Sequence, residues 1–343
     1  MEPGSVGGGR QRPGRPRVLL TMGDPAGVGP EIALRTLADG GLRADFDLVA
    51  VGARDVFERC AARLSLPFDA QVVGTAPEAA PSEPGRPTTA GAAAAAAAVV
   101  EAARLCLSGA ADAMVTAPVI KATVAEAGYD FPGHTEFLAR LAGAGCVVMT
   151  FVHGARRVGL VTNHLPLAAV AGALTKELVL EKLLTLARGL DAALGVKFPR
   201  IAVAALNPHA GERGAIGDEE ARVIAPAVAA AREAGVDAEG PLPADALFPR
   251  LGAREGSGRE GGARFDAALA MYHDQATIPL RLWGVGDAVN VTLGLPIVRT
   301  SPGHGVALDV AGRGVADAGG MIAATRLAGE IAARIARRRT GAG

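Results

Sequence analysis

The amino-acid sequence predicts an α/β fold in which most strands run parallel. Short apolar runs alternate with longer helical segments along the whole chain, which is typical of strands joined by crossover helices. The loops after these runs carry glycine and polar side chains, as at the carboxyl edge of an open α/β sheet. With 343 residues, half of them hydrophobic, the chain is long enough for two domains with sizeable cores.

In the first part of the chain, strands and helices follow one another with clear turn signals. GDPAGVGPE carries Pro30 where the first turn of a helix tolerates proline, so this glycine turn should link a strand to a helix. Its backbone N–H groups favour an anion or a close ligand, although its spacing is neither GxGxxG nor Walker A. Strands are expected at Arg17–Met22, Asp47–Gly52 and Ala113–Val119. One helix should have Pro30 near its first turn, and a second should follow the Asp47–Gly52 strand and end near Leu64. A long loop over 70–89 should then lead into an alanine-rich helix over Ala90–Leu107.

The second part continues the alternation, with one hairpin. CVVMTFVHGARRVGLVTNH predicts two strands with a tight link and a solvated His153 at the turn. Thr175 and Gly195 are the cap and the end of an amphipathic helix. The other expected elements are a strand at Ile201–Leu206, a helix over about Asp218–Ala234, a loop at Gly240–Phe248, a linker-like segment over 252–264 and a last helix over about Asp317–Arg338.

Composition excludes several classes of protein. The 35 basic and 35 acidic residues give no electrostatic case for nucleic acid or an anionic membrane. The alanine-rich run is interrupted by charged residues, so a buried helix fits it better than a membrane span. Three widely spaced cysteines indicate neither disulfides nor a zinc cluster. Residues 1–16 form a flexible Gly/Pro-rich extension without an apolar signal region, and a cytoplasmic location follows.

The stretch from Ala270 to Asp309 gathers the polar groups of a candidate ligand pocket. Between apolar, strand-like runs it presents His273 and Asp274, Arg281, Asn290, Arg299 and His304. A few convergent polar groups in apolar surroundings are typical of a small-molecule site. The histidine suits a metal and the arginines suit a phosphate or carboxylate. A buried sheet edge with ordinary salt bridges is the alternative.

Three of the six histidines share one setting. His164 in TNHLP, His209 in NPHAG and His273 in MYHDQ each follow an apolar strand. Three neutral imidazoles that leave one coordination position open are the pattern of a catalytic zinc-like site. Because more than forty residues separate successive histidines, three unrelated histidines at strand ends remain an alternative.

PGHTEFLA brings His134 and Thr135 to the start of a helix. One interpretation makes Thr135 a plain helix N-cap. The other places both side chains against an anion over the helix N-terminus.

Taken together, these segments resemble the 4-hydroxythreonine-4-phosphate dehydrogenase family of pyridoxal phosphate biosynthesis. The matching segments occur in the family's order and cover nearly all of residues 18–330; they are TMGDPAGVGPEI, TAPVIK, PGHTEFLA, VTNHLPL, LNPHAGE with IGDEE, GPLPADALF, AMYHDQ, and NVTLGLPIVRTSPGHG with DVAGRG. The resemblance implies two α/β/α domains with a cleft between them, of the isocitrate and isopropylmalate dehydrogenase type. The first domain would comprise residues 17–128 plus 300–340, and the second would comprise residues 129–299.

The resemblance also implies the site residues. The metal ligands fall on His164, His209 and His273, with one divalent zinc, magnesium or cobalt ion per site. In the family the site is shared across a homodimer and His273 comes from the partner chain. The substrate contacts fall on His134, Thr135, Arg281, Asn290 and Arg299, of which Arg281 replaces a lysine of the family pattern. Arginine keeps the charge and grips phosphate bidentately, but it is not equivalent to lysine.

The implied reaction is an NAD- or NADP-linked oxidation of a phosphorylated hydroxy amino acid, followed by decarboxylation to 3-amino-2-oxopropyl phosphate. Asp245 and Asp274 are candidates for proton transfer or for orienting the ligand histidines, with a loop cap or a salt bridge as the alternative for each. Because of Arg281, a sister dehydrogenase for phosphothreonate, phosphoerythronate or an aromatic cis-dihydrodiol is a second interpretation. A metal-dependent hydrolase and a non-catalytic metabolite sensor are alternatives from other classes.

Overall fold

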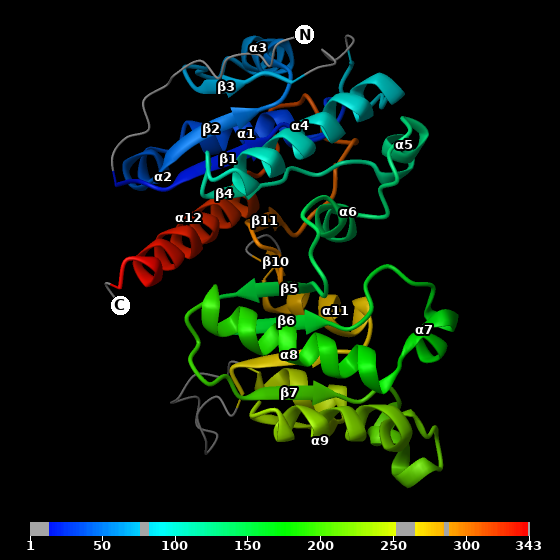
Figure 1. Cartoon of the computed structure of the whole chain (residues 1–343). Coiled ribbons are helices and arrows are strands. Elements are labelled where there is room, and N and C mark those ends of the chain that lie inside the picture. Colours follow the sequence, from blue (N-terminus) through cyan, green and yellow to red (C-terminus); the bar gives the residue numbers. More distant parts are fainter. Residues whose placement is uncertain (1–13, 76–81, 252–264, 285–287, 342–343) are drawn as a thin grey trace. The chain divides into compact units, whose positions relative to one another are not determined.

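The computed structural model describes residues 14–75, 82–251, 265–284 and 288–341 (Figure 1). The chain forms two compact units, the first from Met1–Gly143 and Leu295–Gly343 and the second from Ala144–Gly294. The sequence-based expectation divides the chain after residues 128 and 299. With the observed division, His134, Thr135 and Arg299 belong to the first unit. The predicted linker over 252–264 and most of the N-terminal extension lie outside the described residues.

The part of the first unit that the structure describes is built on five parallel strands in the order β3-β2-β1-β4-β11. Its strands are β1 (Arg17–Thr21), β2 (Asp47–Val51), β3 (Gln71–Val73), β4 (Ala113–Val115) and β11 (Val298–Pro302). Its helices are α1 (Gly29–Leu37), α2 (Gly40–Asp45), α3 (Arg54–Leu64), α4 (Thr89–Leu107), α5 (Lys121–Glu126), α6 (His134–Leu141) and α12 (Gly319–Arg339).

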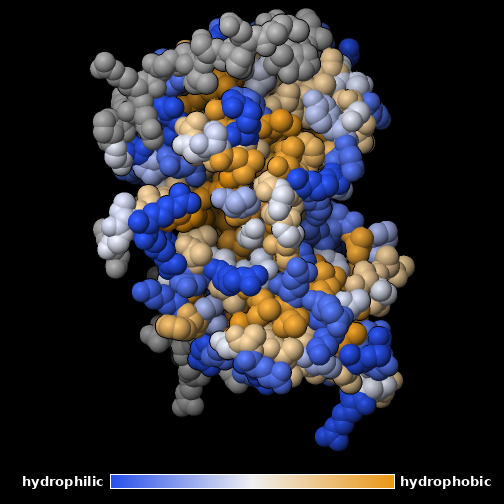
Figure 2. All heavy atoms as spheres, in the orientation of Figure 1, coloured by the Kyte–Doolittle hydropathy of each residue, from blue (hydrophilic) through white to orange (hydrophobic). Residues whose placement is uncertain are grey.

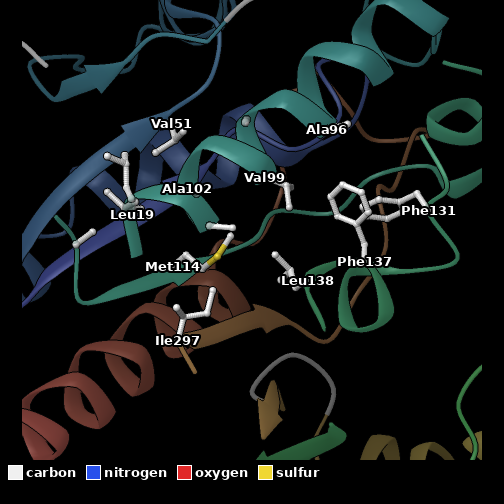
Figure 3. Packing of buried hydrophobic residues seen from close by; sticks show 14 of the residues in the cluster. Leu19, Val51, Ala96, Val99, Ala102, Met114, Phe131, Phe137, Leu138 and Ile297 are labelled. Atoms are coloured by element: carbon white, nitrogen blue, oxygen red, sulfur yellow. The ribbon is translucent and has the colours of Figure 1, made fainter. Parts of the chain in front are cut away.

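Helices cover both faces of this sheet, because the buried residues 18–20 of β1 and Ala113–Val115 of β4 are all apolar. Leu19 and Met114 point from β1 and β4 into a cluster with Val99 of α4 and Leu138 of α6 (Figure 3). Since side chains alternate along a strand, the neighbours of these residues face the opposite side. Helix α12 contacts β1, β4 and β11 and supplies cover for the sheet as well. The core is therefore aliphatic, as the scarcity of aromatic residues predicts.

In its described residues the second unit contains six strands in the order β10-β5-β6-β9-β7-β8. Its strands are β5 (Val148–His153), β6 (Arg156–Leu160), β7 (Ile201–Ala204), β8 (Ala238–Leu242), β9 (Ala267–Ala270) and β10 (Val289–Leu293). Its helices are α7 (Leu167–Ala173), α8 (Lys176–Ala192), η1 (Pro208–Gly214), η2 (Glu220–Ile224), α9 (Ala225–Glu233), α10 (Ala244–Leu247), η3 (Phe248–Arg250) and α11 (His273–Trp283). The β6, β9, β7 and β8 strands run parallel, whereas β5 pairs antiparallel with both β6 and β10.

The mixed α/β fold and most helix ends are confirmed. Pro30 lies in the first turn of α1. Thr88 and Thr175 cap α4 and α8 by accepting hydrogen bonds from the Gly91 and Leu178 amides. By length and composition alone α4 could cross a membrane, but 61% of its apolar window is buried within the protein. This helix is long and apolar because it forms the centre of a core.

Several predictions about the elements are wrong. The loop over 70–89 contains β3, a three-residue edge strand too short to show an alternating pattern. The loop at Gly240–Phe248 contains the end of β8 and helix α10; β8 is an edge strand, where proline is tolerated. The hairpin is not the only antiparallel pairing, since β10 adds a second. His153 is not a solvated turn residue but ends β5, with its Nδ1 atom buried.

The surface is mixed in character. On the face seen in Figure 2, hydrophilic residues are interspersed with apolar ones. In the second unit, Leu167 on α7 and both Ile278 and Leu282 on α11 expose large apolar side chains, with Leu282 82% exposed. Ile278 and Leu282 are four residues apart and therefore share one face of α11.

Candidate active site

A buried arginine is the centre of a charged cluster in the first unit. Arg299 on β11 lies beside Met114 of β4 and is only 2% exposed. Its Nε and Nη2 atoms donate to the Oγ1 atom of Thr116, at 3.1 and 2.6 Å. Thr116 follows the carboxyl end of β4. Burial lowers the pKa of Arg299 to about 9, while the Glu136 carboxylate acts in the opposite direction, so the guanidinium is charged at neutral pH.

His134 and Thr135 open helix α6 beside this arginine. The N-cap residue is Gly133, so Thr135 is not the plain N-cap of one interpretation; it is the second helical residue and is 1% exposed. The Nε2 atom of His134 is buried and has no hydrogen-bond partner among the described residues. Desolvation, followed by the positive charges of Arg299 and Lys121, holds the pKa of His134 well below its usual value. The imidazole is therefore neutral, and its buried nitrogen has capacity for a ligand.

Lys121 and Glu136 complete the cluster, and sequence reasoning assigned them no role. A Cβ atom at Gly133 would lie 2.9 Å from Glu136 Oε2 and 3.7 Å from Lys121 Nζ, so both side chains reach the start of α6. Desolvation lowers the pKa of Lys121, and Glu136 partly offsets this effect. The available signal was the position of Lys121 in TAPVIK, the segment that begins at Thr116 and follows β4 directly. The cluster thus offers two cations, a carboxylate and a neutral imidazole.

In the second unit, two of the three predicted ligand histidines lie together. His164 follows β6 and His273 follows β9, and these strands are parallel neighbours. Their chains stay joined past the strand ends, because Thr162 donates to the Met271 carbonyl from its amide and from its hydroxyl. The two imidazole ring centroids are 5.5 Å apart. That separation suits two ligands on one metal ion of tetrahedral geometry.

Asp274 lies within hydrogen-bond distance of His273. Its Oδ1 atom is 2.7 Å from His273 Nδ1, which leaves Nε2 as the nitrogen available to a ligand. Gln275 accepts from the Met271 amide and donates to the Ala205 carbonyl, both at 2.7 Å. The buried Gln275 side chain therefore ties the end of β9 to the end of β7, and sequence reasoning did not identify it. The donor set fits a divalent metal such as zinc.

His209 comes after β7, the third parallel strand of this group, and is exposed. Its segment is unusual, because φ is positive at six consecutive residues, from His209 to Gly214. Four of these are not glycine, and left-handed backbone costs such residues roughly 1–2 kcal/mol each. Among the described residues, no group of three His, Cys, Asp or Glu side chains of one chain is arranged to hold a metal ion.

The other predicted residues are dispersed. Asn290 lies on β10 opposite Phe151, and its Oδ1 atom is buried without a partner among the described residues. Arg281 is exposed on α11, and Asp245 is exposed on α10.

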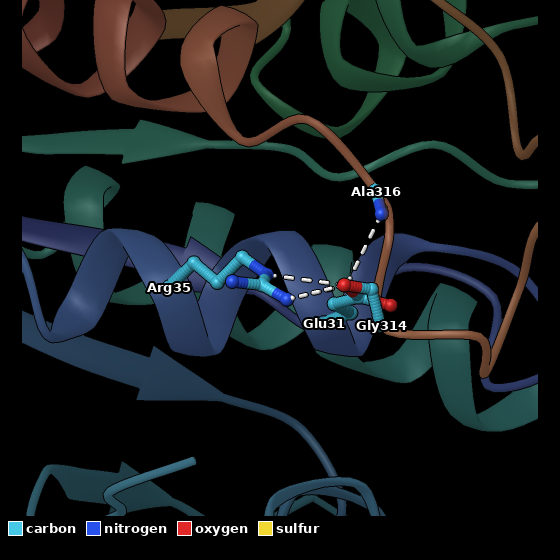
Figure 4. A network of polar contacts seen from close by, with 4 residues as sticks. All are labelled: Glu31, Arg35, Gly314 and Ala316. Carbon is cyan, nitrogen blue, oxygen red and sulfur yellow. Dashed lines mark hydrogen bonds and ion pairs between the residues drawn. The ribbon is translucent and has the colours of Figure 1, made fainter. Parts of the chain in front are cut away.

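The glycine turn GDPAGVGPE and the segment after His304 pack together in the first unit. The Val28 amide donates to the Val306 carbonyl, and a Cβ at Gly27 would lie 2.9 Å from the same oxygen. Glu31, 2% exposed, accepts from Arg35 and from the Ala316 amide, and Arg35 donates to the Gly314 carbonyl (Figure 4). Asp24 keeps a buried Oδ2 atom without a partner among the described residues.

Comparison with known proteins agrees with this architecture. Residues 44–328 match the family model of pyridoxal phosphate biosynthetic protein PdxA. The chain is 48% identical over 335 residues to 4-hydroxythreonine-4-phosphate dehydrogenase of Geobacter metallireducens, covering 93% of this chain and 96% of the relative. The chain belongs to the PdxA family. The resemblance seen in the sequence is thereby confirmed.

Solved structures agree with the PdxA assignment. The crystal structure of 4-hydroxythreonine-4-phosphate dehydrogenase from Klebsiella pneumoniae matches with a TM-score of 0.79 and 36% identity, over 93% of this chain and 99% of that one. A terephthalate 1,2-cis-dihydrodiol dehydrogenase from Burkholderia xenovorans LB400 is more distant, with a TM-score of 0.62 and 27% identity over 92% and 98% of the two chains. Both relatives bear the names of dehydrogenases, so this PdxA chain is an oxidoreductase.

Proposed function

We propose that this PdxA chain catalyses the metal-dependent, NAD- or NADP-linked oxidation of 4-phosphooxy-L-threonine in the cytoplasm. The substrate alcohol would lose a hydride to the nicotinamide and a proton to solvent. The resulting β-keto acid would lose CO2 and give 3-amino-2-oxopropyl phosphate. The observation that carries the proposal is the pairing of His164 with His273, whose ring centroids are 5.5 Å apart, while Asp274 lies within hydrogen-bond distance of His273 Nδ1.

These histidines, with His209, would hold one divalent ion. Such an ion polarises a hydroxyl oxygen and stabilises negative charge that develops there. Asp274 keeps the His273 ring in one orientation and makes it a better ligand, the usual task of a carboxylate behind a ligating histidine. Thr162 and Gln275 hold the loops that carry the two rings.

The metal site would be completed across a homodimer. The family resemblance predicts His273 as the partner's contribution. The contact between His164 and His273 within one chain instead supports a different division, in which these two come from one chain and His209 of the partner subunit is the third ligand. His209 is exposed on its loop, which suits a residue that reaches another chain. The exposed apolar residues Leu167, Ile278 and Leu282 offer contact surface for a second copy.

The substrate contacts would be His134, Thr135, Arg281, Asn290 and Arg299. Arg299 is fixed by Thr116 and remains charged, as recognition of an anionic group requires. The neutral His134 can accept or donate a hydrogen bond without adding a charge. The nicotinamide cofactor, which accepts the hydride, would bind at the glycine turn that ends at Gly29 and at the segment after His304. The buried Asp24 Oδ2 atom there has capacity for a donor from such a ligand.

A sister activity on an aromatic cis-dihydrodiol is the second candidate, because the Burkholderia dihydrodiol dehydrogenase shares the fold and Arg281 departs from the family lysine. The 48% identical relative named for the phosphorylated substrate favours the first candidate.

The test is formation of NADH or NADPH, followed at 340 nm with 4-phosphooxy-L-threonine as substrate, before and after a chelator removes divalent metal ions. His164→Ala and His273→Ala should lose nearly all activity, whereas His153→Gln, a matched histidine change in the same unit, should retain it. Turnover that survives both chelation and the two alanine changes contradicts the proposal. Turnover with a dihydrodiol alone supports the second candidate.

A further inference from the structure

The loop that carries His209 adopts a backbone that its own sequence disfavours. His209, Ala210, Glu212 and Arg213 have φ values of 51, 53, 43 and 58°. L-residues visit this left-handed region as single residues and rarely in succession. Such a run persists only where surrounding contacts determine it. The question is therefore which contacts hold His209 in place.

The carboxylate of Glu220 supplies these contacts. Glu220 begins the π-helical segment η2 and is 5% exposed. Its Oε1 atom accepts from the Leu206 amide at 2.9 Å and from the Asn207 amide at 2.7 Å. Its Oε2 atom accepts from Asn207 Nδ2 at 3.0 Å. Three donors, all from Leu206 and Asn207, the two residues directly before Pro208, thus converge on one buried carboxylate.

The left-handed part of the loop closes over the same carboxylate. A Cβ atom at Gly211 would lie 2.7 Å from Glu220 Oε2 and 2.8 Å from the Gly217 carbonyl oxygen. A Cβ atom at Gly217 would lie 2.3 Å from Asn207 Nδ2. Both glycines have positive φ, at 76 and 111°. The backbone at both positions therefore approaches the Glu220–Asn207 pair more closely than any side chain permits.

We infer that Glu220 is a positioning residue for the metal site: its carboxylate holds the loop over 206–217 in the conformation that presents His209. The inference rests on the proposed function, in which His209 is a metal ligand. In this inference Glu220 is a ligand of neither metal nor substrate. Its effect passes through Asn207 and the backbone to the imidazole, as for carboxylates behind the ligands of other metal sites.

Glu219 provides a matched control. It is the neighbouring glutamate, and its Oε2 atom accepts from the Asn207 side chain at 2.7 Å, whereas the Leu206 and Asn207 amides donate to Glu220. Its pKa is lowered by its own backbone amide and by Asn207, so it carries the same charge as a normal ionised glutamate. A change at Glu219 removes an equal charge from the same place but leaves the backbone donors of the loop satisfied.

The experiment measures Co²⁺ affinity of the full-length protein from the visible absorption of the bound ion, in competition with a chelator. The variants are Glu220→Ala, Glu220→Gln, Gly211→Ala, Glu219→Ala and His209→Ala, each checked for fold by circular dichroism and for mass in solution. Glu220→Ala and Gly211→Ala should weaken Co²⁺ binding about 10- to 100-fold, the usual effect of losing a group behind a ligand. Glu220→Gln can still accept from the two backbone amides, so its Co²⁺ affinity should fall only roughly fivefold, the equivalent of one hydrogen bond. Glu219→Ala should stay within about threefold of wild type, since only a side-chain contact is lost.

The outcomes separate this inference from the proposed function. If His209→Ala weakens Co²⁺ binding and folded Glu220 and Gly211 variants do not, the inference is overturned while the metal assignment stands. If His209→Ala itself leaves affinity unchanged, both are overturned. A Glu220→Gln protein that melts at a lower temperature but binds Co²⁺ with wild-type affinity and spectrum would show a purely structural role and would overturn the inference as well.

Discussion

Replacement of Thr116 by valine should destabilise the first unit and weaken recognition of an anion. The hydroxyl of Thr116 accepts two hydrogen bonds from the Arg299 guanidinium, at 3.1 and 2.6 Å. Valine preserves the branched shape but removes the acceptor. The guanidinium is 2% exposed, so water cannot replace the lost oxygen.

The expected magnitude follows from the charge of the donor. A hydrogen bond to a charged group contributes about 1.5–3 kcal/mol, and the two bonds share one oxygen, so the net loss should be about 2–3 kcal/mol. In a unit of this size each kcal/mol lowers the melting temperature by roughly 2–4 °C, which gives roughly 4–12 °C in total. Thr116→Ser keeps the acceptor oxygen, so its free energy of unfolding and its melting temperature should fall much less.

Differential scanning calorimetry is the suitable assay, because it can resolve separate transitions of two units. Activity measured in parallel should show a larger rise in KM for the phosphorylated substrate than fall in kcat, since the guanidinium loses its fixed orientation. Equal melting temperatures and equal KM values for the valine and serine variants would refute the reasoning.

Two further predictions concern stability. The folded pKa of His134 lies well below 6.5, so the unfolded state binds more protons below about pH 6.5 and the free energy of unfolding should fall on acidification by up to about 1.4 kcal/mol per pH unit. In urea titrations at several pH values, His134→Gln should show a smaller slope, and an unchanged slope would contradict the burial argument. Gly189→Ala places a Cβ 2.7 Å from the Leu293 side chain and should lower the free energy of unfolding by about 1–3 kcal/mol. Gly172→Ala is the control, because its Cβ would meet nothing within 4 Å and the change should be neutral or slightly stabilising. Equal unfolding midpoints for the two variants would be inconsistent with the packing.

The sequence was a good guide where local signals are strong. The Thr175 cap, Pro30 at a first turn and the alanine-rich run of α4 each depend on chemistry within a few residues. Elements without such signals were missed. Strand β3 has three half-buried residues, and α11 contains Pro279, which obscures its helical character.

For the candidate site, the types of the site residues were predictable from the sequence, but the residues that hold them in place were not. The rule that ligands gather at the carboxyl ends of parallel strands correctly brings His164 and His273 together, because β6 and β9 are neighbours. No local pattern shows that Thr116 would contact Arg299, 183 positions along the chain, or that Glu220 would reach back to Leu206. Such contacts depend on strand order and on one unusual loop, which periodicity cannot encode.

Burial, together with the charge arrangement of the first-unit cluster, explains why its histidine is neutral. Arg299 and Lys121 are both cations close to His134, and only Glu136 opposes them. Burial makes a charged ring costly to desolvate, and repulsion by Arg299 and Lys121 adds to that cost, so the ring gives up its proton. The cluster then keeps a net positive charge on side chains fixed by the sheet, together with an uncharged hydrogen-bonding nitrogen. An incoming phosphate would meet charge complementarity without a competing proton equilibrium near neutral pH, and recognition by this cluster should therefore change little between pH 6.5 and 8.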